Sequence, residues 1–78
     1  MKEESISQPF VYRSYTKAEL AYMYVPNRAH STAMKTFNKW IRHNPKLWKR
    51  LQRTGVDVYT QIYSTHQVRI IVGFLGEP

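Results

Sequence analysis

The sequence has no cysteine and few acidic residues, and each scarcity excludes a class of protein. Without thiols the 78-residue chain forms no disulfide framework and no thiolate metal site. Its five Asp and Glu residues are outnumbered by 12 Lys and Arg residues, which gives a formal net charge of +7. This imbalance favours anionic partners. The alternative interpretation is a basic surface that serves only solubility.

Long apolar runs are also missing. No segment approaches the roughly 18 apolar residues that a membrane span needs, and the polar start of the chain has no apolar signal-peptide segment behind it. We therefore expect a cytoplasmic protein without membrane insertion. A chain of this length has room for one core, so we expect a flexible tail over residues 1–8 and a single domain over residues 9–78.

The basic residues are concentrated in one stretch, from residue 28 to residue 53. No acidic residue lies between Glu19 and Asp57, and both tryptophans, Trp40 and Trp48, fall within the interval. Basic clusters with apolar anchors are typical of surfaces that bind polyanions, nucleic acid above all. The basic residues of the stretch are Arg28, Lys35, Lys39, Arg42, Lys46, Lys49, Arg50 and Arg53.

Capping signals and apolar spacing predict four helices, at about 16–24, 31–43, 45–54 and 65–75. Thr16 and Glu19 have the spacing of a capping box, and Asn44 followed by proline is a typical helix start. Asn27 or Ser31 is a candidate N-cap for the second helix. Residues at intervals of three and four form its apolar side, which we expect to be buried: Ala33, Met34, Phe37, Trp40 and Ile41. Trp48 is expected to be core as well.

Two segments favour β-strands, at about 10–14 and 57–63. In the second, a period of two places Val56, Val58, Thr60 and Ile62 on one buried face. We expect the two segments to pair, because a lone strand cannot satisfy its backbone groups. The predicted fold class is therefore α+β and mostly helical, with a small two-stranded sheet.

The chain resembles a family of short Bacteroidota proteins known only as a domain of unknown function. The resemblance extends from about Arg13 to the C-terminus, and it identifies the chain without implying an activity. The residues that carry it are Arg13-Ser14-Tyr15-Thr16-Lys17-Ala18-Glu19-Leu20-Ala21, Tyr24-Val25-Pro26, Trp40-Ile41, Gly55, Gln67-Val68-Arg69 and Leu75-Gly76-Glu77-Pro78.

The segment from Tyr15 to Ala21, with the turn and helix that follow, is similar to the helix-turn-helix of MerR-like and excisionase-like DNA-binding domains. The resemblance implies a helix-turn-helix or winged-helix-like fold whose second helix enters the major groove. The chain departs from that pattern in a longer connection, residues 25–30, and in having no evident glycine-tipped wing hairpin.

From these patterns we expect binding to double-stranded DNA, as a regulator or accessory factor, with DNA preferred over RNA. Helix 31–43 would read the groove, with Asn38 suited to adenine and Arg42 or Lys35 to guanine. Helix 45–54 would hold phosphates. The candidate contact residues are Arg28, Thr32, Lys35, Asn38, Lys39, Arg42, Lys46, Lys49, Arg50 and Arg53.

Catalytic and cofactor-binding functions have little support in the sequence. The scattered acids and the three histidines form no recognisable acid–base or metal-ligand motif, so we expect a non-enzyme without cofactor. The main alternative is a protein–protein adaptor, or a dimeric interaction module that uses apolar surface around Ile70 and Phe74. Peripheral binding to an anionic membrane is weaker, since the helices need their apolar faces for the core.

Overall fold

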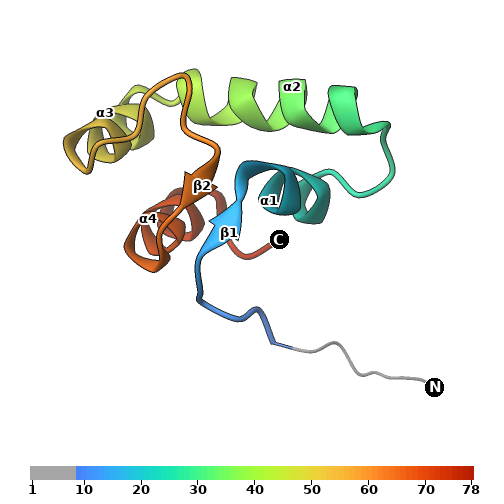
Figure 1. Cartoon of the computed structure of the whole chain (residues 1–78), viewed down its shortest axis with the longest axis horizontal. Coiled ribbons are helices and arrows are strands. Elements are labelled where there is room, and N and C mark those ends of the chain that lie inside the picture. Colours follow the sequence, from blue (N-terminus) through green and yellow to red (C-terminus); the bar gives the residue numbers. More distant parts are fainter. Residues whose placement is uncertain (1–8) are drawn as a thin grey trace.

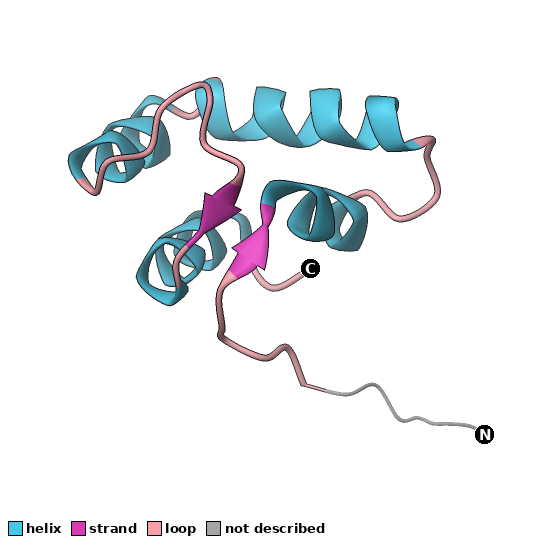
Figure 2. Ribbon diagram, viewed as in Figure 1, coloured by secondary structure: helices cyan, strands magenta, loops and turns pink. Residues whose placement is uncertain are grey.

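Four helices form most of the computed structural model, which describes residues 9–78 (Figures 1 and 2). The tail expected at residues 1–8 lies outside the described residues. Each helix begins and ends within one residue of its predicted range, so the mostly helical α+β class is confirmed. The helices are α1 (Lys17–Tyr24), α2 (His30–Arg42), α3 (Pro45–Arg53) and α4 (Thr65–Leu75).

Local capping explains where α1, α3 and α4 begin, after Thr16, Asn44 and Ser64. The Thr16 side chain accepts from Glu19 N at 3.0 Å, and the Glu19 carboxylate accepts from Thr16 N at 2.8 Å. In the same way Asn44 Oδ1 caps α3 by accepting from Leu47 N at 3.2 Å. The proposed caps of α2 were wrong. That helix follows Ala29 without a side-chain cap, because Asn27 lies in the preceding turn and Ser31 already lies inside the helix.

The predicted sheet exists, but its strands are shorter than expected. β1 (Tyr15–Thr16) pairs antiparallel with β2 (Ile62–Tyr63), with Tyr15 opposite Tyr63. The strand expected at 10–14 is instead an irregular segment just before β1. Most of the strand expected at 57–63 is a turn, because the Asp57 side chain accepts from Tyr59 N at 2.8 Å and Thr60 N donates to Asp57 O at 3.2 Å. These local bonds replace a sheet ladder.

The turn also changes which side chains of this segment are buried. Val58 and Ile62 are exposed although the alternating pattern placed them inside, whereas Tyr63 is only 2% exposed. The irregular segment before β1 is attached by side chains: Ser14 Oγ donates to Tyr63 O at 2.8 Å, and Phe10 stacks on Tyr15 at 5.5 Å between ring centroids. The main contribution of the sheet is therefore its two buried tyrosines, Tyr15 and Tyr63, because its backbone pairing is short.

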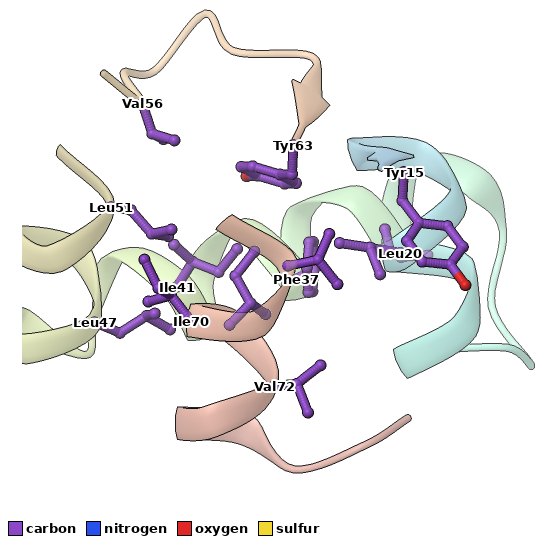
Figure 3. Packing of buried hydrophobic residues seen from close by; sticks show 14 residues of the cluster. Tyr15, Leu20, Phe37, Ile41, Leu47, Leu51, Val56, Tyr63, Ile70 and Val72 are labelled. Atoms are coloured by element: carbon purple, nitrogen blue, oxygen red, sulfur yellow. The ribbon is translucent and has the colours of Figure 1, made fainter. Parts of the chain in front are cut away.

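The core lies between all four helices, as Figure 3 shows. Leu47 of α3 and Ile41 of α2 meet Ile70 of α4 on one side, while Leu20 and Phe37 fill the space between α1 and α2. In Figure 1, α2 runs along the longest axis over α1, and α3 and α4 lie at its far end. No helix in residues 9–78 combines the length and apolarity needed to cross a membrane.

Trp40 is the main departure from the predicted core. Its side chain is 41% exposed, whereas Trp48 is partly buried against the core. The Tyr24 ring is partly buried and stacks on Phe37 at 5.5 Å, so it covers Phe37 between α1 and α2. Trp40 is left to pack edge-on against the outside of Tyr24, at 6.5 Å between centroids.

Candidate nucleic-acid interface

The basic residues of α3 form one continuous stripe because the apolar residues of the helix occupy its other side. Leu47 and Leu51 are fully buried and anchor α3 on the core. The spacing of three and four places the cations together on the solvent side. With Phe74 of α4, they line a surface hollow of about 260 Å³. These cations are Lys46, Lys49, Arg50 and Arg53.

A second hollow of about 410 Å³ adjoins the first, since both include Arg50 and Phe74. Its other lining residues all belong to α4, which packs beside α3. They are His66, Arg69, Ile70 and Gly73. We call the two hollows together the α3–α4 groove. It has an apolar floor between two helices and carries cationic side chains on both.

No carboxylate of residues 9–78 lies within ion-pair distance of the groove cations. Within residues 9–78, Arg13 and Glu19 form the one ion pair within 4.0 Å, at 3.8 Å and half exposed. None of the four α3 cations has a carboxylate partner in that range. Their charges therefore add to a positive surface potential, which attracts anions and raises their rate of encounter.

Lys46 is placed against the local preference of its helix. It follows Pro45 in the first turn of α3, and this turn contains no acidic residue. The helix dipole makes this end positive and favours Asp or Glu there. A lysine at this position therefore opposes the dipole, while Arg50 and Arg53 in the last turn complement it.

The C-terminal end of α3 is closed by a local hydrogen bond and a glycine. Thr54 Oγ1 donates to Leu51 O at 2.6 Å. Gly55 follows with φ of 102°, in the left-handed region that glycine adopts most readily. The chain then turns back toward β2, which allows α4 to pack beside α3.

The predicted contact residues of α2 do not share this groove. Thr32, Lys35, Lys39 and Arg42 lie exposed along the helix, and Asn38 is half-buried, which leaves its amide less accessible than expected. Arg28 is exposed in the connection before α2. Two candidate surfaces therefore exist: an exposed stripe on α2 and the α3–α4 groove. Arg42 of α2 makes a cation–π contact with α3, since its guanidinium lies 5.9 Å from the centroid of the Trp48 ring.

A further cation lies behind the α2 stripe. Lys17 is buried, and burial lowers the pKa of its ammonium group. The positive charge of Arg42 lowers this pKa further, whereas Asp57 raises it. Arg42 and Asp57 therefore have opposite effects on the charged form of Lys17.

The sequence interpretation missed two residues of the groove, His66 and Arg69 of α4, and it named Phe74 only as part of a possible dimer surface. The sequence did contain a signal for this face of α4, because His66, Arg69, Ile70 and Gly73 recur at intervals of three and four.

In residues 9–78, His, Asp and Glu side chains form no group of three that would hold a metal ion.

Comparison with known proteins gives a family and nothing more specific. The model of a family described as "Domain of unknown function (DUF4248)" matches residues 11–78. No curated protein and no solved structure matches the chain. The groove and the α2 stripe therefore have to be interpreted from their own chemistry.

Proposed function

The chain belongs to the DUF4248 family, and we propose that this member is a non-catalytic domain that binds nucleic acid, with double-stranded DNA as its main target. The observation that carries the proposal is the grouping of four α3 cations around one hollow without a described carboxylate beside them. Phosphate oxygens are the anions that such a linear set of Lys and Arg suits best.

Lys46 supports this proposal because its charge works against helix stability. A cation in the first turn of a helix costs a few tenths of a kcal/mol relative to a neutral residue. A surface charge that served only solubility would be as effective at many other positions. The placement of Lys46 at the edge of the hollow is what an anion-binding role requires.

In the proposed complex, α2 lies in the major groove and α3 holds the phosphate backbone. Consecutive helices α1 and α2 pack together across a five-residue connection, residues 25–29. The α2 stripe offers Lys35 and Arg42 to guanine and Thr32 to the backbone. Asn38 is a weaker candidate for adenine because it is half-buried.

A wing is not part of the proposed interface. Within residues 9–78 the sheet joins β1 to β2 across three intervening helices, so it is not a hairpin that could extend beside the duplex. The phosphate contacts that a wing would supply fall instead to α3. The proposed role is that of a cytoplasmic regulator or accessory factor in transcription or another DNA transaction.

Fluorescence anisotropy with a labelled, mixed-sequence, blunt duplex tests the proposal. If five or six cations contact phosphates, log K falls against log salt with a slope of roughly −5. Measurements at about 50 and 200 mM salt give this slope, since the expected loss is large over that range. A dissociation constant weaker than about 100 µM at the lower salt contradicts the proposal, because non-specific DNA binders do better.

The chain provides a control for net charge. Lys49→Gln removes one groove cation, and Gln52→Glu adds one acid on the same helix but outside the groove, so both variants have net charge +7 − 1 = +6. Lys49→Gln should reduce the salt slope by about 0.9. If the two variants weaken binding equally, overall charge explains the affinity and α3 is not a specific contact surface.

A triple variant tests the role of α2. Lys35→Ala/Lys39→Ala/Arg42→Ala removes exposed side chains and should leave the fold intact, as circular dichroism would verify. We expect a loss of duplex affinity that includes a loss of preference among sequences, because base contacts specify whereas phosphate contacts position. Unchanged affinity and sequence preference would remove α2 from the interface.

The adaptor or dimer function remains the second candidate, and a different surface favours it. Tyr22 and Met23 are exposed on α1, where they line a hollow of about 430 Å³ with Tyr15. The dimer surface expected around Ile70 and Phe74 is less suitable, because Ile70 is buried in the protein's own core. Phe74 is bordered by cations that would repel a second copy. Sedimentation velocity with Tyr22→Ser/Met23→Ser tests for association through α1.

A further inference from the structure

We propose that the α3–α4 groove binds an unpaired nucleotide, with the base stacked on Phe74 and the flanking phosphates bound by the α3 cations. This inference rests on the proposed nucleic-acid function and specifies the form of the ligand. It assigns Phe74, Arg69 and His66 to a ligand site. The protein would then prefer DNA with a single-stranded segment to a blunt duplex.

The first argument is the chemistry of the hollow beside α3. Phe74 is 38% exposed although it is a large aromatic residue, and the surface around it is mainly apolar. Lys and Arg contribute their aliphatic stems to such surfaces and keep their charges in solvent. The hollow is therefore apolar inside and positive at its edge. A base attached to phosphates has the complementary distribution, since its face is apolar and its charge lies at the side.

The second argument is the length of the charged edge. Lys46 and Arg53 are separated by seven residues, which is about 10 Å along a helix that rises 1.5 Å per residue. Phosphates of one stacked strand rise by about 3.4 Å each along the duplex axis and lie further apart through space, so the edge is long enough for two consecutive phosphates. The edge thus suits a linear polyanion better than a single small anion. An isolated phosphate would contact only one or two of the cations.

The third argument is that the groove continues past Phe74 into the second hollow. Gly73 borders this part, and a Cβ atom added there would meet no atom within 4 Å. Close helix packing therefore does not explain the glycine. The Arg69 guanidinium lies 5.2 Å from the Tyr12 ring centroid, a cation–π contact that holds a further cation beside the opening. A strand crossing Phe74 would meet another positive group on leaving the α3 edge.

A blunt duplex would use only part of this site. Its bases are stacked and paired, so it offers phosphates to the cations and has no free base face for Phe74. Stacking of a base on an aromatic side chain contributes enough to change affinity by roughly fivefold to more than a hundredfold. Phe74 should therefore distinguish the two forms of DNA, whereas the α3 cations should act on both.

The test compares three labelled ligands by anisotropy at one salt concentration: a blunt duplex, the same duplex with a short single-stranded overhang, and the single strand alone. We expect the wild type to bind the duplex with the overhang at least about fivefold more tightly than the blunt duplex. Phe74→Ala should abolish this advantage and lower blunt-duplex affinity much less. Phe74→Trp retains an aromatic face and should preserve the advantage.

Two matched variants make the result specific to the groove. Tyr59→Ala removes an aromatic ring that is 82% exposed and lies outside the groove, so it should change none of the three affinities. Phe74→Leu keeps an apolar side chain without a ring. Because Leu supports the packing, this variant tests stacking even if Phe74→Ala does not fold. It should lose most of the advantage.

The outcomes separate the inference from the function on which it rests. Equal binding of all three ligands, unaffected by Phe74→Leu, overturns the inference and leaves duplex binding in place. Failure of all three to bind overturns both. Tighter binding of an acidic peptide with one aromatic residue, or of vesicles containing anionic phospholipid, by wild type but not Phe74→Leu also overturns the inference. The groove would then serve a different class of ligand.

Discussion

The side chain of Gln67 in α4 donates to Thr54 at the end of α3. Its Nε2 atom lies 3.0 Å from Thr54 Oγ1 and 3.4 Å from the Thr54 carbonyl oxygen, while its Oε1 atom accepts from Ser64 N at 2.9 Å. One amide thus caps α4 and connects it to α3 at the same time. Because these helices form the two walls of the groove, Gln67 helps to set their relative position.

Replacing Gln67 should therefore lower the free energy of unfolding in two separable ways, through loss of the contact with Thr54 and through loss of the cap on α4. Gln67→Glu keeps an acceptor for Ser64 N but cannot donate to Thr54, so we expect the free energy of unfolding to fall by about 0.5–1.5 kcal/mol. Gln67→Ala loses the cap as well and should cost about 1 kcal/mol more. Urea unfolding followed by tryptophan fluorescence measures both. Equal costs would mean that the cap on Ser64 N contributes little, and an unchanged stability of Gln67→Glu would mean that the contact with Thr54 contributes little.

Lys46→Glu should raise stability and lower affinity together. An acid in the first turn of α3 interacts favourably with the helix dipole, which contributes about 0.3–1 kcal/mol to the free energy of unfolding. The same change reverses one charge at the edge of the groove and should weaken DNA binding. Thermal unfolding and anisotropy on the same samples provide the two measurements. A variant that loses both stability and affinity would instead indicate a structural role for Lys46.

The exposure of Trp40 changes the expected cost of its removal. The sequence interpretation assigned Trp40 to the core, which implies a loss of roughly 3–5 kcal/mol in Trp40→Ala. With 41% of the side chain exposed, about 1–2 kcal/mol is expected instead. Phe37→Ala provides the comparison, since Phe37 is 0% exposed and should cost the full 3–5 kcal/mol. Chemical unfolding that ranks Trp40→Ala equal to Phe37→Ala would contradict the observed packing.

Stability should fall in alkaline solution because of Tyr63. Burial raises the pKa of Tyr63 from 10.0 to about 12, although the positive charge of Arg42 opposes the shift. The folded protein therefore holds this proton more tightly than the unfolded chain. The corresponding stability is complete below pH 10 and is lost as the pH rises toward 12. The loss is at most about 2.7 kcal/mol, at 1.36 kcal/mol per pKa unit.

Tyr63→Phe isolates this effect, because it keeps the packed ring and removes the titrating hydroxyl. The free energy of unfolding, measured by urea titration between pH 9 and about 12, should decline less steeply in this variant than in the wild type. Some decline should remain, since burial also raises the pKa of Tyr24 to about 12. Identical profiles for the two proteins would show that Tyr63 does not contribute.

The sequence predicted the helices well because their signals are local. A capping box joins residues three apart, and Asn44 with the following proline starts α3 whatever the rest of the chain does. The grouping of the α3 cations was equally predictable, since helix geometry alone places positions 46, 49, 50 and 53 on one side. Leu47 and Leu51 then determine which side faces solvent.

The β-strands could not be located in this way, because pairing depends on residues far apart in the chain. Alternation over residues 56–63 resembled a half-buried strand, but Asp57 and Thr60 satisfy their backbone groups in a local turn. Only two residues remain to pair with β1. Of the face assigned to the core, Val56 is buried but Val58 and Ile62 are exposed, since a turn interrupts the period of two on which the assignment relied.

The sequence by itself determined the helices, the charge of the chain and the stripe of cations on α3, because each follows from neighbours within one or two helical turns. Tertiary structure decided which apolar residues are buried and which residue of another helix lies beside the α3 cations. Tyr24 covers Phe37 and leaves Trp40 outside. Phe74 comes from a helix distant in sequence and lines the same hollow as the α3 cations. Packing competition between helices settles such positions, and no local spacing encodes it.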